Sequence, residues 1–200
     1  MIFNFLRLMV RAVIKLLYRI RVEGRGNFPK KGAIVLCANH TYYKDLLIIG
    51  SISPRKIHWM AKSELFRNPL FGALIKSLGA FSVNRGGNDR DSVKTVYNVL
   101  NSGAALGIFP EGTRVNDPDN RPPYKRSFVT FAAKTGAAIL PVAVSYGGGP
   151  FGRGRLFSRA VLSFGEAVRL EQGHKYSRDE LDGHAASIMS WIYGRIATNH

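Results

Sequence analysis

Short apolar runs alternate with segments of helical periodicity along most of the chain. Each run has the length and apolar character of a strand buried on both faces of a sheet. We expect strands at residues 18–23, 33–38, 57–61, 80–83, 104–109, 138–145 and 159–164. We expect helices after residue 45 and at residues 68–78, 89–101, 125–135 and 177–198. This alternation predicts a single α/β domain for the 200 residues.

Residues 1–20 combine an apolar composition with a basic stripe. Arg7, Arg11, Lys15 and Arg19 recur every four residues, so they lie along one side of a helix, and apolar residues fill most of the rest. A secretory signal needs an unbroken apolar core, and a transmembrane helix needs roughly 20 mostly apolar residues. The charge at every turn excludes both. We expect an amphipathic helix in the membrane interface, and the alternative is the same helix packed on its own domain.

The charge of the chain points to an anionic partner. The sequence has 29 Lys and Arg residues against 13 Asp and Glu, a formal net charge of +16 at pH 7. Nucleic acid, an acidic membrane surface, a phosphorylated substrate and an acidic carrier protein would all suit that charge. The single cysteine, Cys37, lies in an apolar run. It excludes an internal disulfide and favours a reducing, cytosolic setting, with Cys37 as a small core residue.

Candidate chemistry begins directly after the apolar run at residues 33–38. Asn39 and His40 follow this run, and Asp45 lies five residues beyond the histidine. In a strand this spacing places the two side chains on opposite faces, and in a helix about 140° apart, so they meet only across a turn. A carboxylate that fixes the tautomer of a histidine makes it a competent general base.

The same spacing recurs at His174 and Asp179, where we expect a structural role. Ser177 and Glu180 are three residues apart at the start of a predicted helix, which is the pattern of a capping box. Asp179 then lies in the first turn, where an acidic residue is favoured by the helix dipole.

Polar clusters also follow three other predicted strands. They are Arg85, the segment from Glu111 to Arg114, and a turn expected around Pro141. Because α/β proteins build sites at the strand ends of one sheet, we expect these clusters to converge beside the histidine. The guanidinium groups of Arg85 and Arg114 can bind phosphate oxygens bidentately, and Gly112 would let the backbone approach a ligand closely.

Four sequence blocks resemble the glycerolipid acyltransferases, in particular the bacterial 1-acyl-glycerol-3-phosphate (lysophosphatidic acid) acyltransferases. The blocks are NHTYYKD at residues 39–45, GAFSVNR at 79–85, FPEGTR at 109–114 and ILPVAV at 139–144. They come in the family's order, and FPEGTR matches the family's third block residue for residue. IHWMAKSELF at residues 57–66 strengthens the match. A histidine and an aspartate at this spacing are weak evidence alone, but together with FPEGTR they form a specific signal.

The resemblance implies a glycerol-3-phosphate acyltransferase-like fold, an α/β domain with a mixed central sheet flanked by helices. Residues 21–200 would form this acyltransferase domain, and residues 1–20 the membrane-interface helix. The implied reaction transfers a fatty acyl group from an acyl thioester to the free hydroxyl of a lysophosphatidic acid, giving phosphatidic acid. The implied location is peripheral, on the cytoplasmic face of the cell membrane.

The resemblance also implies catalytic roles at the first block. His40 would be the general base and Asp45 its orienting partner. No covalent acyl-enzyme is needed, because the acceptor hydroxyl is itself the nucleophile. No metal or other cofactor is implied, and the remaining histidines show no metal-ligand spacing.

The other blocks supply the implied substrate-binding residues. Arg85 and Arg114 would hold the phosphate of the acceptor. Glu111 would position the glycerol part or the arginines, Gly112 would admit the ligand, and Thr113 would add a hydroxyl contact.

Several partners and alternatives follow from the resemblance and the charge. The expected partners are an anionic membrane surface, lysophosphatidic acid, and acyl-CoA or acyl carrier protein as the donor, with no nucleic acid. Tyr42 stands where many members have Ser, and Asn84 where many have Asp, which leaves the acceptor open to glycerol-3-phosphate or another lysolipid. A non-catalytic basic protein that binds lipid or nucleic acid is the alternative from another class, and only the net charge supports it.

Overall fold

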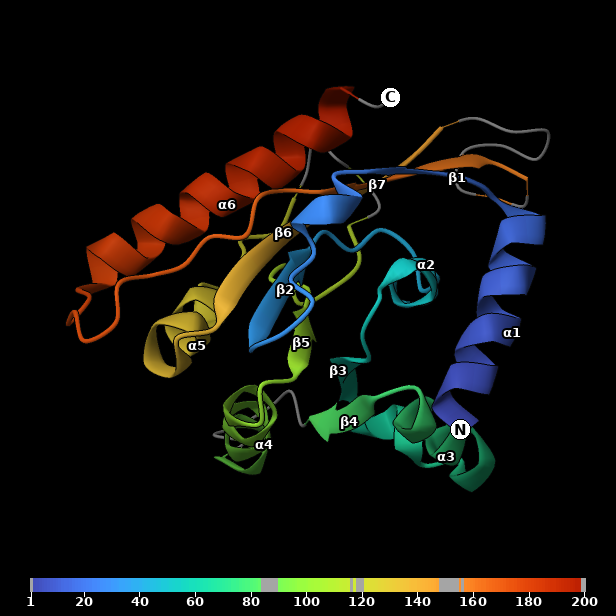
Figure 1. Cartoon of the computed structure of the whole chain (residues 1–200), viewed down its shortest axis with the longest axis horizontal. Coiled ribbons are helices and arrows are strands. Elements are labelled where there is room, and N and C mark those ends of the chain that lie inside the picture. Colours follow the sequence, from blue (N-terminus) through green and yellow to red (C-terminus); the bar gives the residue numbers. More distant parts are fainter. Residues whose placement is uncertain are drawn as a thin grey trace.

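The computed structural model contains a seven-stranded sheet with helices on both faces (Figure 1). The structure describes residues 2–83, 90–115, 117, 121–147, 155 and 157–198. In the first helix, side chains are described only at residue 5 and from residue 8 onward. The strands are Arg19–Glu23 (β1), Ile34–Ala38 (β2), Ile57–Lys62 (β3), Ala80–Val83 (β4), Ala105–Ile108 (β5), Ala138–Tyr146 (β6) and Arg159–Phe164 (β7). The helices are Ile2–Leu17 (α1), Asp45–Ile52 (α2), Pro69–Ser77 (α3), Arg90–Asn101 (α4), Ser127–Thr135 (α5) and Arg178–Thr198 (α6), with short 3-10 helices at Arg25–Asn27 (η1) and Ser63–Phe66 (η2).

The strand order across the sheet is β1-β7-β6-β2-β5-β3-β4. Strand β6 pairs in parallel with β2 and antiparallel with β7, and β1 pairs in parallel with β7. All remaining pairs are parallel, so β1 and β7 run against the other strands. These findings confirm the predicted α/β fold with a mixed central sheet, and the predicted strands and helices lie within a few residues of their expected bounds.

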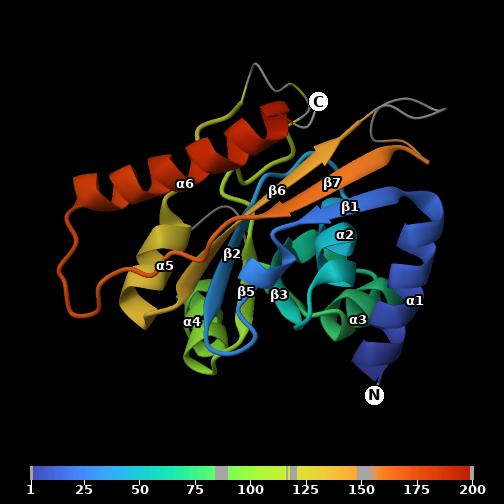
Figure 2. The same ribbon diagram turned by 45° about the horizontal axis from the view of Figure 1, so that its top comes forward.

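Helices cover both faces of the sheet. Helices α1, α2 and α3 lie on one face, and α4, α5 and α6 lie on the other (Figures 1 and 2). Strand β2 is buried between the two layers, with Ile34, Leu36 and Ala38 in the core beneath α1 and α2, and Val35 and Cys37 in the core beneath α4, α5 and α6. This alternation explains why β2 reads as an unbroken apolar run.

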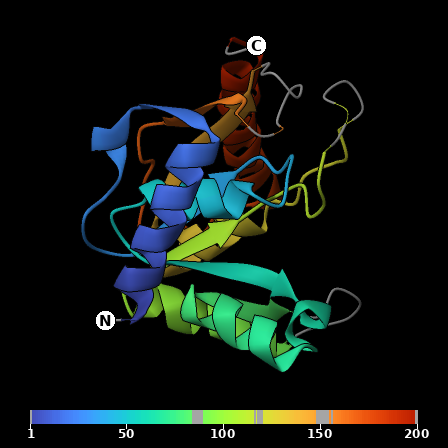
Figure 3. The ribbon, with the colours of Figure 1, turned by 90° about the vertical axis from the view of Figure 1, so that its right-hand side faces the viewer.

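Helix α1 packs through a narrow stripe, and the remaining apolar side chains that the structure describes in this helix are exposed. Ile14 is buried against the sheet, and Val10 and Leu17 are partly buried beside it. Figure 3 shows α1 lying in front of α2, on the side of the sheet opposite α6. The exposed apolar side chains of α1 are Phe5, Leu8, Met9, Val13 and Leu16. Within the described residues, no helix has both the length and the apolar character needed to cross a bilayer.

The expected turn around Pro141 is wrong, because Pro141 lies inside β6. Its carbonyl accepts the N–H of Gly165 at 2.9 Å. The regular pairing of β6 with β7 begins at Val142 and Phe164, and Ile139 forms an isolated bridge with Val168. Pro141 lies between these two points, where the β6–β7 ladder is interrupted. A proline has no N–H to donate, and at this interruption the strand accommodates it without losing a ladder bond.

Candidate active site

Asn39 continues the sheet by one residue after β2 ends. Its side-chain amide donates to the carbonyl of Val144 at 2.9 Å, and its side-chain oxygen accepts the N–H of Val144 at 2.8 Å. Both residues are buried. The side chain therefore replaces the backbone ladder at the point where the chain leaves the strand, and it fixes the position from which His40 projects.

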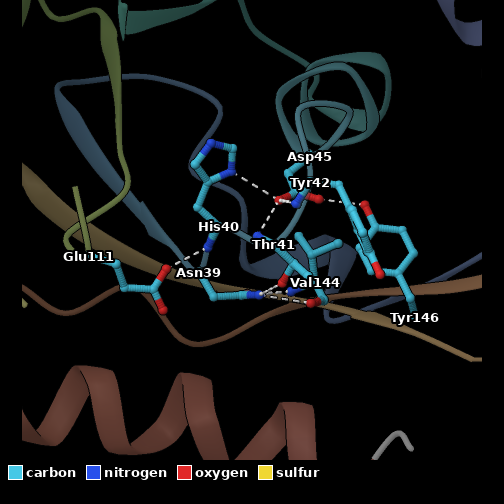
Figure 4. A network of polar contacts seen from close by, with 8 residues as sticks. All are labelled: Asn39, His40, Thr41, Tyr42, Asp45, Glu111, Val144 and Tyr146. Atoms are coloured by element: carbon cyan, nitrogen blue, oxygen red, sulfur yellow. Dashed lines mark hydrogen bonds and ion pairs between the residues drawn. The ribbon is translucent and has the colours of Figure 1, made fainter. Parts of the chain in front are cut away.

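The turn from Thr41 to Lys44 brings His40 and Asp45 together, as predicted. His40 Nδ1 lies 3.1 Å from Asp45 Oδ2 (Figure 4). The same oxygen accepts the backbone N–H groups of Thr41 at 2.7 Å and Tyr42 at 2.8 Å. Asp45 is fully buried at the start of α2, so these donors, together with the helix N-terminus, stabilise its charge.

The geometry around His40 favours one tautomer and one ring orientation. The Asp45 carboxylate can only accept a hydrogen bond, so the contacting Nδ1 of His40 carries the ring proton. The lone pair of Nε2 is then free to accept another proton. The ring stacks on Phe109, with centroids 4.1 Å apart, and Phe109 stacks in turn on Trp59 at 5.1 Å. Only 13% of the His40 side chain is exposed, so the imidazole is held in a largely shielded position.

Glu111 reaches the turn that holds His40 and Asp45 from the loop that follows β5. Its Oε2 accepts the backbone N–H of His40 at 2.7 Å, and its Oε1 accepts the hydroxyl of Tyr193, on α6, at 3.2 Å. Burial raises the pKa of Glu111, and these two hydrogen bonds oppose that shift. The convergence of the FPEGTR segment on His40 is confirmed. The carboxylate contacts the backbone of His40, which favours a role in orienting the turn over the predicted contact with glycerol or arginine.

The other predicted substrate-binding residues lie around the same edge. Gly112 has a φ of 67°, a left-handed conformation that suits glycine in the turn after β5. Thr113 and Arg114 are exposed, and the Arg114 guanidinium lies over the ring of Tyr43, 3.9 Å from its centroid. Arg85 lies outside the described residues, as does Asn84.

A second aromatic group packs behind Asp45. The Tyr146 hydroxyl, at the end of β6, donates to Asp45 Oδ1 at 2.5 Å. The ring of Tyr42 packs edge-on against Tyr146, with centroids 4.9 Å apart. Lys44 Nζ lies 4.5 to 4.8 Å from the ring centroids of Tyr42, Tyr146 and Tyr18, and burial lowers the pKa of Lys44.

An apolar cavity of about 630 Å³ lies beside this site, between α1, α2, α3 and the sheet. Alternate residues of β3, namely Ile57, Trp59 and Ala61, form one wall and span about 13 Å along the strand. Trp59 also belongs to the stack that reaches His40, so this wall leads to the imidazole. Tyr43 lines the cavity at the end nearer His40, and Arg55 lines it at the amino end of β3.

Sequence patterns missed several residues of the site. Tyr146 and Tyr193 reach it from β6 and α6, more than 80 positions away from the residues they contact. Such contacts leave no local signal. The aromatic stack could have been suspected at Phe109, because it is the first residue of the FPEGTR block.

Two structural interpretations made from the sequence are confirmed. Ser177 N–H donates to Glu180 Oε2 at 2.7 Å, Glu180 N–H donates to Ser177 Oγ, and His174 Nε2 lies 3.0 Å from Glu180 and not beside Asp179. Cys37 is a buried free thiol that contacts the sulfur of Met189 at 3.9 Å. Among the residues that the structure describes, no cluster of three or more His, Cys, Asp or Glu could hold a metal ion.

Comparison with known proteins places this geometry in a family. The family model described as Acyltransferase matches residues 19–145. A 1-acyl-sn-glycerol-3-phosphate acyltransferase from Bacillus subtilis is 32% identical over 154 residues, which cover 76% of this chain and 74% of that protein. A lyso-ornithine lipid O-acyltransferase from Pseudomonas aeruginosa is 30% identical over 139 residues, covering 69% of this chain and 52% of that protein.

A solved structure has the same fold. The 1-acyl-sn-glycerophosphate acyltransferase PlsC from Thermotoga maritima superposes with a TM-score of 0.75 and 23% identity, covering 98% of this chain and 80% of the other. The matched segment, residues 19–145, contains the His40–Asp45 turn and the FPEGTR loop that meets it. The chain belongs to the acyltransferase family.

Proposed function

We propose that the chain transfers a fatty acyl group from an acyl thioester to the free hydroxyl of 1-acyl-glycerol-3-phosphate, giving phosphatidic acid. The observation that supports this best is the His40–Asp45 contact of 3.1 Å beside a large apolar cavity. The names of the relatives from Bacillus subtilis and other bacteria favour this acceptor.

His40 acts as the general base in this proposal. Its Nε2 takes the proton of the acceptor hydroxyl while the hydroxyl oxygen attacks the thioester carbonyl. The tetrahedral intermediate then collapses, the carbon–sulfur bond breaks, and the imidazolium returns the proton to the leaving thiolate. Asp45 stabilises the imidazolium between the two steps, and the loss of this proton transfer costs typically 10²–10⁴-fold.

Arg114 and Arg85 hold the phosphate of the acceptor in this proposal. The Arg114 guanidinium is exposed at the edge of the site and stacks on Tyr43, which leaves its N–H groups available in a defined plane. Arg85 follows β4 in the sequence, and its assignment rests on the resemblance alone. Thr113 lies next to Arg114 and is suited to a hydroxyl contact with the same headgroup.

The apolar cavity holds a fatty acyl chain. Its walls are formed by aliphatic and aromatic side chains, and it begins near the imidazole that would activate the acceptor. An acyl chain inside it would place the carbonyl carbon beside His40. The thiol carrier is CoA or acyl carrier protein, and both are anionic partners for a chain with this positive charge.

In this proposal, helix α1 binds the cytoplasmic face of the cell membrane. Helices α1 and α3 lie on the same face of the sheet and both have exposed apolar side chains, in α3 Leu70 and Phe71, and Phe71 also lines the cavity. Arg11 and Lys15 lie along the same helix, and each basic group near an anionic surface contributes about 1 kcal/mol. A monotopic protein would then draw both lipid substrates from the bilayer.

Acyl transfer from oleoyl-CoA to lysophosphatidic acid in mixed micelles tests the proposed reaction. We expect His40→Ala to lower kcat by about 10²–10⁴-fold. His184→Ala on α6 is the control, and we expect it to retain wild-type activity. Undiminished transfer by the His40→Ala protein would reject the general-base role. An acceptor screen with glycerol-3-phosphate and lyso-ornithine lipid, run beside lysophosphatidic acid, identifies the preferred acceptor.

Sedimentation with liposomes tests the membrane face. We expect Leu8→Asp/Leu16→Asp to release the protein from vesicles that contain anionic lipid, and high salt to weaken wild-type binding. Val93→Asp is a matched control, because Val93 is 43% exposed on α4 at the opposite face of the sheet. Equal sedimentation of both variants would reject α1 as the membrane anchor.

A further inference from the structure

Asp45 uses its two carboxylate oxygens differently. Oδ2 accepts hydrogen bonds from His40 Nδ1 and from the backbone N–H groups of Thr41 and Tyr42. Oδ1 receives the hydroxyl of Tyr146 (Figure 4). Contacts to one oxygen leave a carboxylate able to rotate about its bond to Cβ, whereas a donor on the second oxygen fixes the plane of the group. The Tyr146 hydroxyl therefore determines how Oδ2 is presented to the imidazole.

Tyr146 is itself held rigidly. It is the last residue of β6 and pairs with Ala160 of β7, and only 2% of its surface is exposed. The edge-on ring of Tyr42 and the ammonium group of Lys44 pack against its ring. Burial raises the pKa of Tyr146 far above that of an exposed phenol, and the nearby Asp45 raises it further. The hydroxyl thus stays protonated and donates throughout the pH range of an enzyme assay.

We propose that Tyr146 is a positioning residue, whose hydroxyl fixes the plane of the Asp45 carboxylate and thereby the orientation of the His40 ring. Substrate cannot reach the buried hydroxyl, so Tyr146 acts only through Asp45. This inference rests on the proposed general-base role of His40. It adds a residue from β6, 101 positions beyond Asp45, to the machinery of the catalytic turn.

The substitution Tyr146→Phe removes the hydroxyl and keeps the ring. We expect kcat for acyl transfer to fall by about 10-fold, by analogy with hydrogen-bond partners that orient metal-bound histidines, whose loss typically costs 10–100-fold. We expect KM for both substrates to change by less than about two-fold, because the hydroxyl does not touch substrate. The control Tyr176→Phe removes a phenol that accepts the backbone N–H of Glu171 at 2.7 Å, remote from the site, and should leave kcat unchanged.

A double-mutant cycle with Asp45→Asn separates positioning from a general loss of structure. If Tyr146 acts through Asp45, Tyr146→Phe will lower kcat little further in the Asp45→Asn background. If the hydroxyl only stabilises the fold, the two losses will multiply, and the proposal is overturned. Wild-type kcat in the Tyr146→Phe enzyme overturns it as well. A fully active Asp45→Asn enzyme also overturns it, because Tyr146 acts only through Asp45, whereas the general-base role of His40 is tested separately by His40→Ala.

Thermal unfolding checks that the variants fold. If Tyr146→Phe does not fold, proton NMR of the wild-type enzyme provides the test instead. A slowly exchanging phenolic proton that disappears in Asp45→Asn supports the hydrogen bond to Asp45. A spectrum with no such proton, recorded under conditions where buried amide protons are protected, contradicts it.

Discussion

Replacement of Asn39 by alanine tests whether its side chain holds the end of β2 in the sheet. The substitution removes both hydrogen bonds to Val144, at 2.9 and 2.8 Å. Val144 is 1% exposed, so its N–H and carbonyl would be left without partners inside the protein. Each buried backbone group left unpaired costs about 1–3 kcal/mol. The expected loss is therefore about 2–6 kcal/mol, against a total stability of about 5–15 kcal/mol for a typical domain.

Urea unfolding followed by circular dichroism measures this loss. With a slope of about 1–3 kcal/mol per molar urea, the midpoint should fall by about 1 M or more. Asn98→Ala is the matched control, because Asn98 is exposed on α4 and its replacement should change stability by about 0.5 kcal/mol or less. If Asn39→Ala is no more destabilising than this control, Asn39 does not hold the strand end.

Asn39→Asp adds a dependence on pH to the same test. The aspartate retains an acceptor for the Val144 N–H but places a second oxygen against the Val144 carbonyl. Burial and this contact raise the pKa of the new carboxyl in the folded state above its unfolded value of about 3.9. The penalty relative to wild type is therefore full above the folded pKa and disappears as the pH falls below the unfolded pKa. A penalty that stays constant from acid to neutral pH would contradict this reasoning.

Three further predictions concern single residues. Gly112→Ala should lower the free energy of unfolding in urea by about 1–2 kcal/mol. An added Cβ meets nothing within 4 Å, so the cost comes only from the backbone strain of an alanine at a φ of 67°. An unchanged free energy of unfolding would refute this strain. Burial raises the pKa of the Cys37 thiol, so the native protein should resist a thiol reagent at mild alkaline pH and react only on unfolding; rapid native labelling would contradict this. Hydrogen bonds from Ser177 lower the pKa of Glu180 to about 2, so its stabilising effect should be present above about pH 4.5 and be lost as the pH falls toward 2, measured against Glu180→Gln; equal pH dependence of both proteins would refute it.

The sequence predicted the fold well because the information was local. Strands such as β2 and β5 are continuous apolar runs, and helices such as α4 have their own periodicity, while Ser177 and Glu180 mark the start of α6. The meeting of His40 with Asp45 followed from the need for a turn between strand and helix. Its meeting with Glu111 followed from the adjacency of strand ends in one sheet, and both contacts are present.

What the sequence did not reveal depends on tertiary packing. Tyr146 and Tyr193 look like ordinary apolar-face residues of a strand and a helix until the sheet order brings them to Asp45 and Glu111. The sequence predicts both a strand at residues 138–145 and a turn around Pro141, and the interruption of the ladder beside β7 explains why β6 continues through the proline.

The position of β2 has a consequence for how the protein is made. Its two sheet neighbours, β5 and β6, both come later in the chain. The hydrogen bonds to Asp45 and Glu111 likewise come from Tyr146 and Tyr193, which are synthesised later. The contacts around the candidate site therefore cannot all form until α6 has been synthesised. Such long-range pairing slows folding, and the network around His40 is complete only after α6 has docked on the sheet.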